Sequence, residues 1–303
     1  MFAAAPLVIT AAVHVFTPES SAPDSPGSLV SASQQARQDA KARAEAKAER
    51  EAEAEREADE KVIAAAPPGL AAPDKKQLAQ KLVASAENST LDWRTTYGSI
   101  EDAGDGCGCT AGIIGLCTGT NDLRVLVERH TKSHPHDGLA AYLPALREVD
   151  GTDSHEGLAP GFTKAWQAEA KAPAFRKAQD SERDRVYFDP AVRLAELDGL
   201  GTLGQFVYYD AMVHHGPGTG PDGFYGLRER ALQEADTPAE GGREKVYLDV
   251  FLDIRRTSMK SADPDLDTTR IDTAQRRFVY DGNPELRTPL VWQVYGETFR
   301  VAE

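Results

Sequence analysis

Cysteine is scarce in this sequence, and acidic residues outnumber basic ones. The three cysteines, Cys107, Cys109 and Cys117, fall within eleven residues, so they cannot form a disulfide scaffold for the chain. With 34 Lys and Arg against 48 Asp and Glu, the formal net charge is −14. Because binding to nucleic acid phosphates requires an excess of basic residues, we exclude nucleic acid as a partner and expect a cationic or neutral substrate.

The sequence also has no apolar run long enough for a comfortable membrane span. Residues 2–16 are mostly apolar, but a transmembrane helix needs about 20 such residues. This stretch is similar to the apolar core of a signal peptide, although no Lys or Arg precedes Arg37 and the usual basic lead is missing. We therefore expect a secreted, extracellular protein and no stable membrane insertion of its mature form.

The next segment is rich in Ala, Glu, Lys and Arg. Residues 34–61 carry nine acidic and seven basic side chains and almost nothing large and apolar. Such a composition favours a solvated helix or spacer over a coiled coil, which needs apolar residues at its core positions. Pro67, Pro68 and Pro73 end this segment. We predict a signal-like and Pro-rich part over 1–33, a charged spacer over 34–73 and a large folded domain over 74–303.

Helical periodicity dominates that third part. A Gly-rich stretch at 98–119 indicates loops and short strands, whereas apolar spacing elsewhere is typical of helices. The sequence therefore predicts a mainly α fold with a small β element. The expected helices cover 74–86, 121–132, 138–149, 161–171, 175–184, 197–214, 223–234 and 244–261.

Two charged residues fall on apolar helix faces. Asp210 lies three and four residues after Val207 and Phe206, and Arg255 lies between Phe251 and Met259 in the same way. A buried charge is costly without a partner, so the two side chains are expected to pair, unless each lies at the rim of its face and reaches water.

Several carboxylates surround the Gly-rich stretch. Glu87 follows a predicted helix, and Asp105 lies in the loop after it. Hydrolysis of a glycosidic bond requires two carboxyl groups with different roles, so this pair is a candidate. In so acidic a chain, surface solvation is the commoner role of such residues.

The order and spacing of these residues resembles the signature of glycoside hydrolase family 46, the bacterial chitosanases. The resemblance covers Asp74 to Tyr295. It is carried by Glu87-Asn88, Tyr97, Asp105, Gly108, Thr110, Ile114-Gly115, Asp122, Tyr142 to Leu146, Glu182 to Pro190, Gly204 to Asp210, His215 to Gly218, Thr237 to Gly242 and Tyr247 to Arg255.

The resemblance implies a lysozyme-like fold of two lobes with a central substrate cleft. It also implies an endo-acting, inverting chitosanase without cofactor or metal, with Glu87 as general acid and Asp105 as general base. Thr110 matches the residue that helps to position the attacking water, although its hydroxyl could instead bond only the backbone. Asp210 and Arg255, together with Arg270, match a buried ion network that leads to Glu87.

For substrate binding, the resemblance implies polar cleft positions at Ser89 and His215 and a carboxylate for a glucosamine ammonium at Asp122. Chitosan, a polycationic polysaccharide, is the expected partner of a monomeric enzyme. Two alternatives stay open from the residues themselves. Asp122 could cap the helix that follows it, and His215 could close a helix before Gly216.

The cysteines depart from the family pattern, which usually has an Arg where Cys107 stands and often an aromatic residue where Cys109 stands. They could be free thiols, form a disulfide between Cys117 and one of the other two, or bind a metal, for which no nearby His is available before His130. Two alternative functions follow. One is a catalytically weakened chitosan-binding or cell-wall-binding protein, and the other is a lysozyme-like hydrolase of peptidoglycan.

Overall fold

The computed structural model describes residues 26–102, 104 and 106–302, with only the backbone described for 26–36 and 39. The chain divides into two compact units, 1–58 and 59–303. The apolar segment predicted at 2–16 and the candidate base Asp105 lie outside the described residues.

The charged segment forms one long helix, α1 (Pro26–Ala65). Its described side chains are largely exposed, as expected of a helix without an apolar stripe. Ion pairs one turn apart, such as Lys41–Glu45 at 3.7 Å and Lys47–Glu51 at 3.5 Å, support it weakly. Among the described helices, none is both long and apolar enough to cross a membrane.

Helices also dominate the second unit, which confirms the predicted mainly α fold. They are α2 (Pro73–Glu87), α3 (Asp122–Ser133), α4 (Leu143–Val149), α5 (Phe162–Glu169), α6 (Pro173–Arg183), α7 (Asp189–Leu197), α8 (Thr202–His215), α9 (Phe224–Glu234), α10 (Glu244–Ala262) and α11 (Arg276–Tyr280), with the π-helical turns η5 (Asp184–Phe188) and η7 (Arg270–Gln275).

The expected small β element is a three-stranded antiparallel sheet. It consists of β1 (Ile100–Asp102), β2 (Cys109–Ala111) and β3 (Leu116–Cys117), with β2 in the centre. A second sheet was not predicted: β4 (Leu290–Val294) and β5 (Glu297–Val301) form a hairpin. Its signal is the alternation of Leu290, Trp292 and Val294, whose side chains are all buried.

One helix prediction was wrong. The expected helix over 197–214 is interrupted, because α7 ends at Leu197 and α8 begins only at Thr202. Gly199 lies between them with φ +74°, a left-handed conformation that glycine adopts at low cost. The two helices therefore pack against each other instead of continuing as one.

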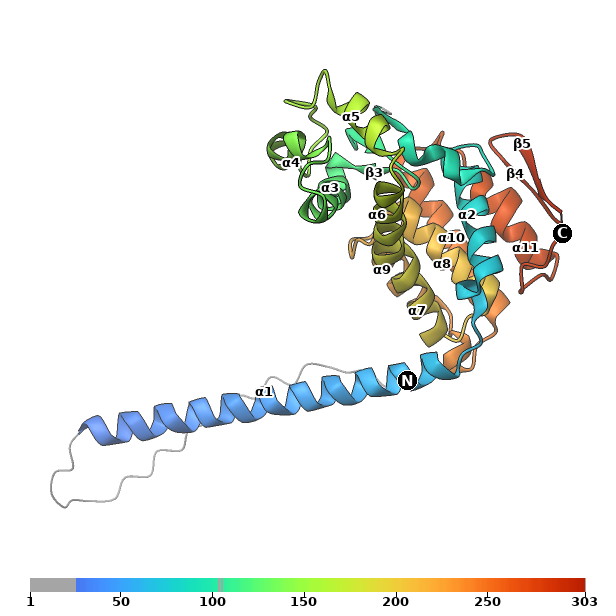
Figure 1. Ribbon diagram of the computed structural model, residues 1–303. Coiled ribbons are helices and arrows are strands. Elements are labelled where there is room, and N and C mark those ends of the chain that lie inside the picture. The colour runs from blue at the N-terminus through green and yellow to red at the C-terminus, as the bar shows by residue number, and fades with distance from the viewer. Residues whose placement is uncertain (1–25, 103, 105, 303) are drawn as a thin grey trace, which may run out of the picture. The chain divides into compact units, whose positions relative to one another are not determined.

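Figure 1 shows two groups of elements within the second unit, which correspond to the predicted lobes. The first contains α3, α4, α5 and the three-stranded sheet, and the second contains α2, α8, α10, α11 and the β4–β5 hairpin. Large aromatic side chains fill both groups: Trp166 is completely buried in the first, and Trp292 in the second.

Candidate active site

Glu87 is the last residue of α2. That helix buries Leu78, Leu82 and Val83 on its inner face, which fixes the direction of its carboxyl end. The Glu87 side chain remains 24% exposed, and its Oε1 lies 2.7 Å from Nη2 of Arg270. The carboxyl group thus faces solvent on one side and a buried guanidinium on the other.

Arg270 connects Glu87 to the ion network. The same Nη2 that pairs with Glu87 lies 2.9 Å from Oδ1 of Asp210, and Oδ2 of Asp210 lies 3.0 Å from Nη2 of Arg255. Arg255 also donates to Gln275 Oε1 at 2.8 Å, and Gln275 donates back to Asp210. The side chains of Arg270, Asp210 and Arg255 are at most 2% exposed. The structure therefore joins α8, α10 and η7 behind Glu87, with the pairing anticipated from the apolar helix faces.

The electrostatics of this network stabilise its charged form. Burial alone would raise the pKa of Asp210, but Arg270 and Arg255 hold it well below its ordinary value. Burial likewise opposes the charge on Arg270, yet Asp210 and Glu87 together raise the pKa of this guanidinium. Arg255 shows the opposite balance, because burial lowers its pKa to about 10 despite Asp210. All three groups are charged at neutral pH, and the buried charges compensate one another.

His214 is a member of the network that the sequence prediction missed. Its Nδ1 lies 2.7 Å from Nη1 of Arg270. Burial and the charge of Arg270 hold the pKa of His214 well below its ordinary value, so the imidazole is neutral and accepts the hydrogen bond. The adjacent His-His pair in the sequence gave no indication of which ring would turn toward the network.

The remaining candidate catalytic residues belong to the segment of the three-stranded sheet. Asp105 belongs to the connection between β1 and β2, outside the described residues, and its neighbours Gly104 and Gly106 have φ values of +69° and +86°. Thr110 lies on β2, opposite Glu101 of β1 and Cys117 of β3. The Thr110 Oγ1 is buried and finds no hydrogen-bond partner in the part of the chain that the structure describes.

Cys107 and Cys117 form a disulfide, while Cys109 is buried as a free thiol. Of the three alternatives for these cysteines, the structure therefore has the disulfide. The carbonyl of Cys107 also accepts hydrogen bonds from Gly119 N at 3.0 Å and Thr118 Oγ1 at 3.2 Å. The loop that contains Asp105 is thus fastened covalently to the end of β3.

The three expected substrate-binding residues lie in different environments. Ser89 is exposed just beyond α2, with φ +50°. His215 ends α8, and its Nε2 is buried without a partner among the described residues. Burial, together with Arg255 and Arg270, lowers the pKa of His215 to about 3.

Asp122 is 8% exposed at the start of α3. Its Oδ1 accepts hydrogen bonds from Cys117 N, Thr120 Oγ1 and Leu123 N at 2.7 to 2.8 Å. Asp122 is the first residue of α3, and the N-cap position before it is occupied by Asn121, without a side-chain cap. Its Oδ2 accepts from the Tyr187 hydroxyl and keeps capacity for one further donor. Burial raises the pKa of Asp122.

The arrangement thus combines a carboxyl group at a helix end, a buried ion network and a short sheet. The model of Glycosyl hydrolase family 46 matches residues 81–290. The chain belongs to glycosyl hydrolase family 46.

Relatives in this family cover most of the chain. A chitosanase of Streptomyces sp. (strain N174) is 53% identical over 231 residues, which are 76% of this chain and 83% of that protein. A chitosanase of Nocardioides sp. (strain N106) is 51% identical over 77% of this chain and 84% of its own. A solved structure of chitosanase OU01 with substrate matches with a TM-score of 0.76 and 49% identity, covering 78% of this chain and all of that one. The chain is thus a glycoside hydrolase, and α1 lies outside the matched residues.

Proposed function

We propose that this protein is a secreted, endo-acting chitosanase that hydrolyses β-1,4 linkages between glucosamine units with inversion of the anomeric configuration. The observation that best supports the proposal is the environment of Glu87. Its carboxyl group is partly exposed and is paired at 2.7 Å with the buried Arg270. Chitosanases related to this chain over most of its length support the choice of substrate.

In this mechanism Glu87 is the general acid. Its exposed side faces the substrate and donates a proton to the glycosidic oxygen as the bond to the anomeric carbon breaks. Arg270 fixes the orientation of the carboxyl group, since Asp210 and His214 hold the guanidinium from the other side. After the reaction, the glutamate is left as an anion beside Arg270, which stabilises it until it is protonated again.

Asp105 is the general base. It removes a proton from a water molecule that attacks the anomeric carbon from the face opposite the leaving group. Inversion requires the two carboxyl groups to stand about 6.5–9.5 Å apart, because this water must fit between the sugar and the base. Thr110, whose buried hydroxyl is unpartnered among the described residues, helps to position the water.

Substrate selection depends on charge. A glucosamine polymer carries ammonium groups, which a chain of net charge −14 attracts. Asp122 Oδ2 is the acceptor for one ammonium, and Ser89 and His215 supply polar contacts along the chain of sugars.

The test is digestion of partly acetylated chitosan by the wild type and by Glu87→Gln and Asp105→Asn, with product lengths and anomeric form recorded. We expect internal cleavage with inverted products from the wild type. General acid–base catalysis contributes about 10²–10⁴-fold, and each variant should lose activity by at least that range at unchanged thermal stability. Products that retain the anomeric configuration of the substrate would contradict the assignment, and so would undiminished activity of Glu87→Gln.

The same assay separates the two alternative functions. A catalytically weakened binding protein would bind chitosan without releasing reducing ends. A hydrolase of peptidoglycan would cut that polymer faster than chitosan.

A further inference from the structure

The tip of the β4–β5 hairpin presents an aromatic residue in an unfavourable backbone conformation. Tyr295 has φ +51° and the following Gly296 has φ +78°, and these two residues form the turn between the paired Val294 and Glu297. Two-residue turns with both φ values positive strongly favour Asn-Gly or Asp-Gly, because an L side chain with a bulky group is disfavoured there. A tyrosine at the first position is therefore a strained choice for the turn itself.

The tyrosine ring does not compensate for this conformation by burial. Trp292 and Phe299 of the same hairpin are 0% and 9% exposed, whereas Tyr295 is 47% exposed. Residues that remain in strained conformations without a packing benefit cluster at functional sites. The position of this ring in the fold is consequently informative.

Hydrogen bonds fix the hairpin next to the acid. Trp292 Nε1 donates to Ser85 Oγ at 2.9 Å, two residues before Glu87 on α2. The Thr273 hydroxyl donates to the Gln293 carbonyl at 2.6 Å, and Tyr295 N donates to Thr269 Oγ1 at 2.9 Å. The hairpin tip is thus attached to the residue that directly precedes Arg270.

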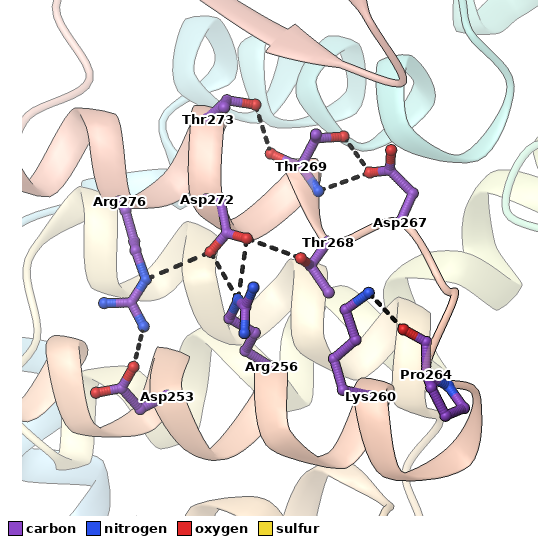
Figure 2. Close-up of polar contacts among 10 residues, drawn as sticks. All are labelled: Asp253, Arg256, Lys260, Pro264, Asp267, Thr268, Thr269, Asp272, Thr273 and Arg276. Carbon is purple, nitrogen blue, oxygen red and sulfur yellow. Dashed lines mark hydrogen bonds and ion pairs between the residues drawn. The ribbon is translucent and has the colours of Figure 1, made fainter.

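The start of η7 is itself rigidly held, as Figure 2 shows. Asp267 accepts hydrogen bonds from both the backbone and the hydroxyl of Thr269. The single hydroxyl proton of Thr273 is shared between the Gln293 carbonyl and the Thr269 carbonyl, whose oxygen lies 3.0 Å from Thr273 Oγ1. On the neighbouring side, Asp272 accepts from Thr268 at 2.7 Å. Thr269 is therefore a fixed support for the backbone of Tyr295.

Nearby charges also influence the pKa of the Tyr295 hydroxyl. Burial of part of the side chain raises the pKa of Tyr295, and the negative charge of Glu87 raises it further, while Arg270 acts in the opposite direction. These electrostatic influences accompany the hydrogen bond that holds the backbone of Tyr295 at Thr269, next to Arg270 in the sequence.

We infer that Tyr295 is a substrate-contacting residue whose exposed ring packs against the glucosamine unit bound next to Glu87. This inference rests on the proposed function. A tyrosine face offers apolar area to the C–H face of a sugar and attracts a ligand cation through its ring quadrupole, so it suits a sugar that carries an ammonium group. The strain at Tyr295 then reflects selection for substrate contact over turn stability.

The test replaces the tyrosine by the residue that the turn prefers. Tyr295→Asn should raise the KM for chitosan about tenfold, the loss expected for one aromatic contact with a cationic sugar. Its melting temperature should stay equal or rise, because asparagine tolerates φ +51°. Tyr295→Phe keeps the ring and should stay within about threefold of the wild type.

A matched control is Tyr280→Asn. Tyr280 is 60% exposed on α11, and its ring lies 3.8 Å from the Lys245 ammonium, so its loss should leave KM unchanged. An unchanged KM in Tyr295→Asn would overturn the inference. A KM that rises together with a fall in melting temperature would assign Tyr295 a structural role and overturn it as well.

A binding experiment separates this inference from the proposed function. The dissociation constant of a glucosamine hexamer is measured by calorimetry for Glu87→Gln and for Glu87→Gln combined with Tyr295→Asn. Binding weakened about tenfold by the second change supports the substrate contact even if the wild type fails to cut chitosan. Equal affinities would overturn the contact even if cleavage is efficient.

Discussion

The two sides of the active site are built in opposite ways. The acid side consists of Glu87, Arg270, Asp210, Arg255 and Gln275, which come from four different elements. The buried charges of Arg270, Asp210 and Arg255 meet there beside the partly exposed Glu87 and the neutral Gln275. The base side is one local segment, residues 100–118, made of short strands and closed by a disulfide. Long-range electrostatics orient Glu87, the proposed acid, and a disulfide within one segment links Cys107 to Cys117 on the side of the proposed base.

The largest effect is expected from a substitution on the acid side. Asp210→Asn leaves two buried guanidinium groups without their shared counter-charge, and removal of one partner from a buried ion pair costs about 3–5 kcal/mol. We expect this loss in the free energy of unfolding in urea, together with a large decrease in kcat because Arg270 no longer holds Glu87.

The control for this variant is Asp253→Asn. Asp253 also forms an ion pair, with Arg276, but its side chain is 72% exposed. Exposed pairs contribute about 0–1 kcal/mol, so its stability should hardly change. Similar losses in both variants would contradict the distinction between buried and exposed pairs in this protein.

The next largest effect is expected from removal of the disulfide on the base side. Replacing both Cys107 and Cys117 by Ser removes the disulfide, whose two cysteines are ten positions apart in the sequence. A disulfide typically contributes about 2–4 kcal/mol, mainly by restricting the unfolded chain. We expect that loss in unfolding experiments and a lower kcat/KM, because the loop with Asp105 gains freedom.

Treatment of the wild type with dithiothreitol should reproduce the double variant, and the double variant itself should be insensitive to it. If reduction leaves kcat/KM unchanged, the disulfide supports the fold without restraining the base.

A smaller effect concerns pH on the acid side. The folded-state pKa of His215 is about 3, below the ordinary value of 6.5, so the unfolded chain takes up a proton first. Its contribution to stability is complete above about pH 6.5 and is lost as the pH falls toward 3. We expect His215→Asn to reduce the drop in melting temperature between pH 7 and pH 4 by about 4 °C. If the melting temperatures of the two proteins fall equally with pH, His215 has the same pKa in the folded and the unfolded state, which contradicts this prediction.

The smallest stability effect is expected at Thr110. Its buried hydroxyl has no partner in the described residues, so Thr110→Val removes an unsatisfied polar group and should change the free energy of unfolding by no more than about 1 kcal/mol. Activity should still fall about tenfold, since the attacking water loses a hydrogen bond. Thr110→Ser keeps the hydroxyl and serves as the control. A large loss of stability in Thr110→Val would indicate a structural role instead.

Much of this protein was predictable from local sequence patterns. The apolar spacing of α2, α3 and α10 predicted helices whose limits differ from the observed ones by at most one residue, because a periodic apolar face is a property of the segment itself. Asp210 and Arg255 stood out for the same reason: each interrupts such a face. The family resemblance then selected Glu87 from among many carboxylates.

The partners of these residues could be decided only by the tertiary structure. Periodicity placed Asp210 and Arg255 inside, but the meeting of Asp210, Arg270 and His214 behind Glu87 depends on how α8 and η7 pack. The cysteine spacing allowed free thiols, a disulfide or a metal site, and only the folded structure shows that Cys107 meets Cys117. The exposed ring of Tyr295 is a further case, since the hairpin that presents it was not predicted from the sequence. Local patterns determine which side chains a segment buries, whereas the packing of distant segments determines which charged side chains meet behind Glu87.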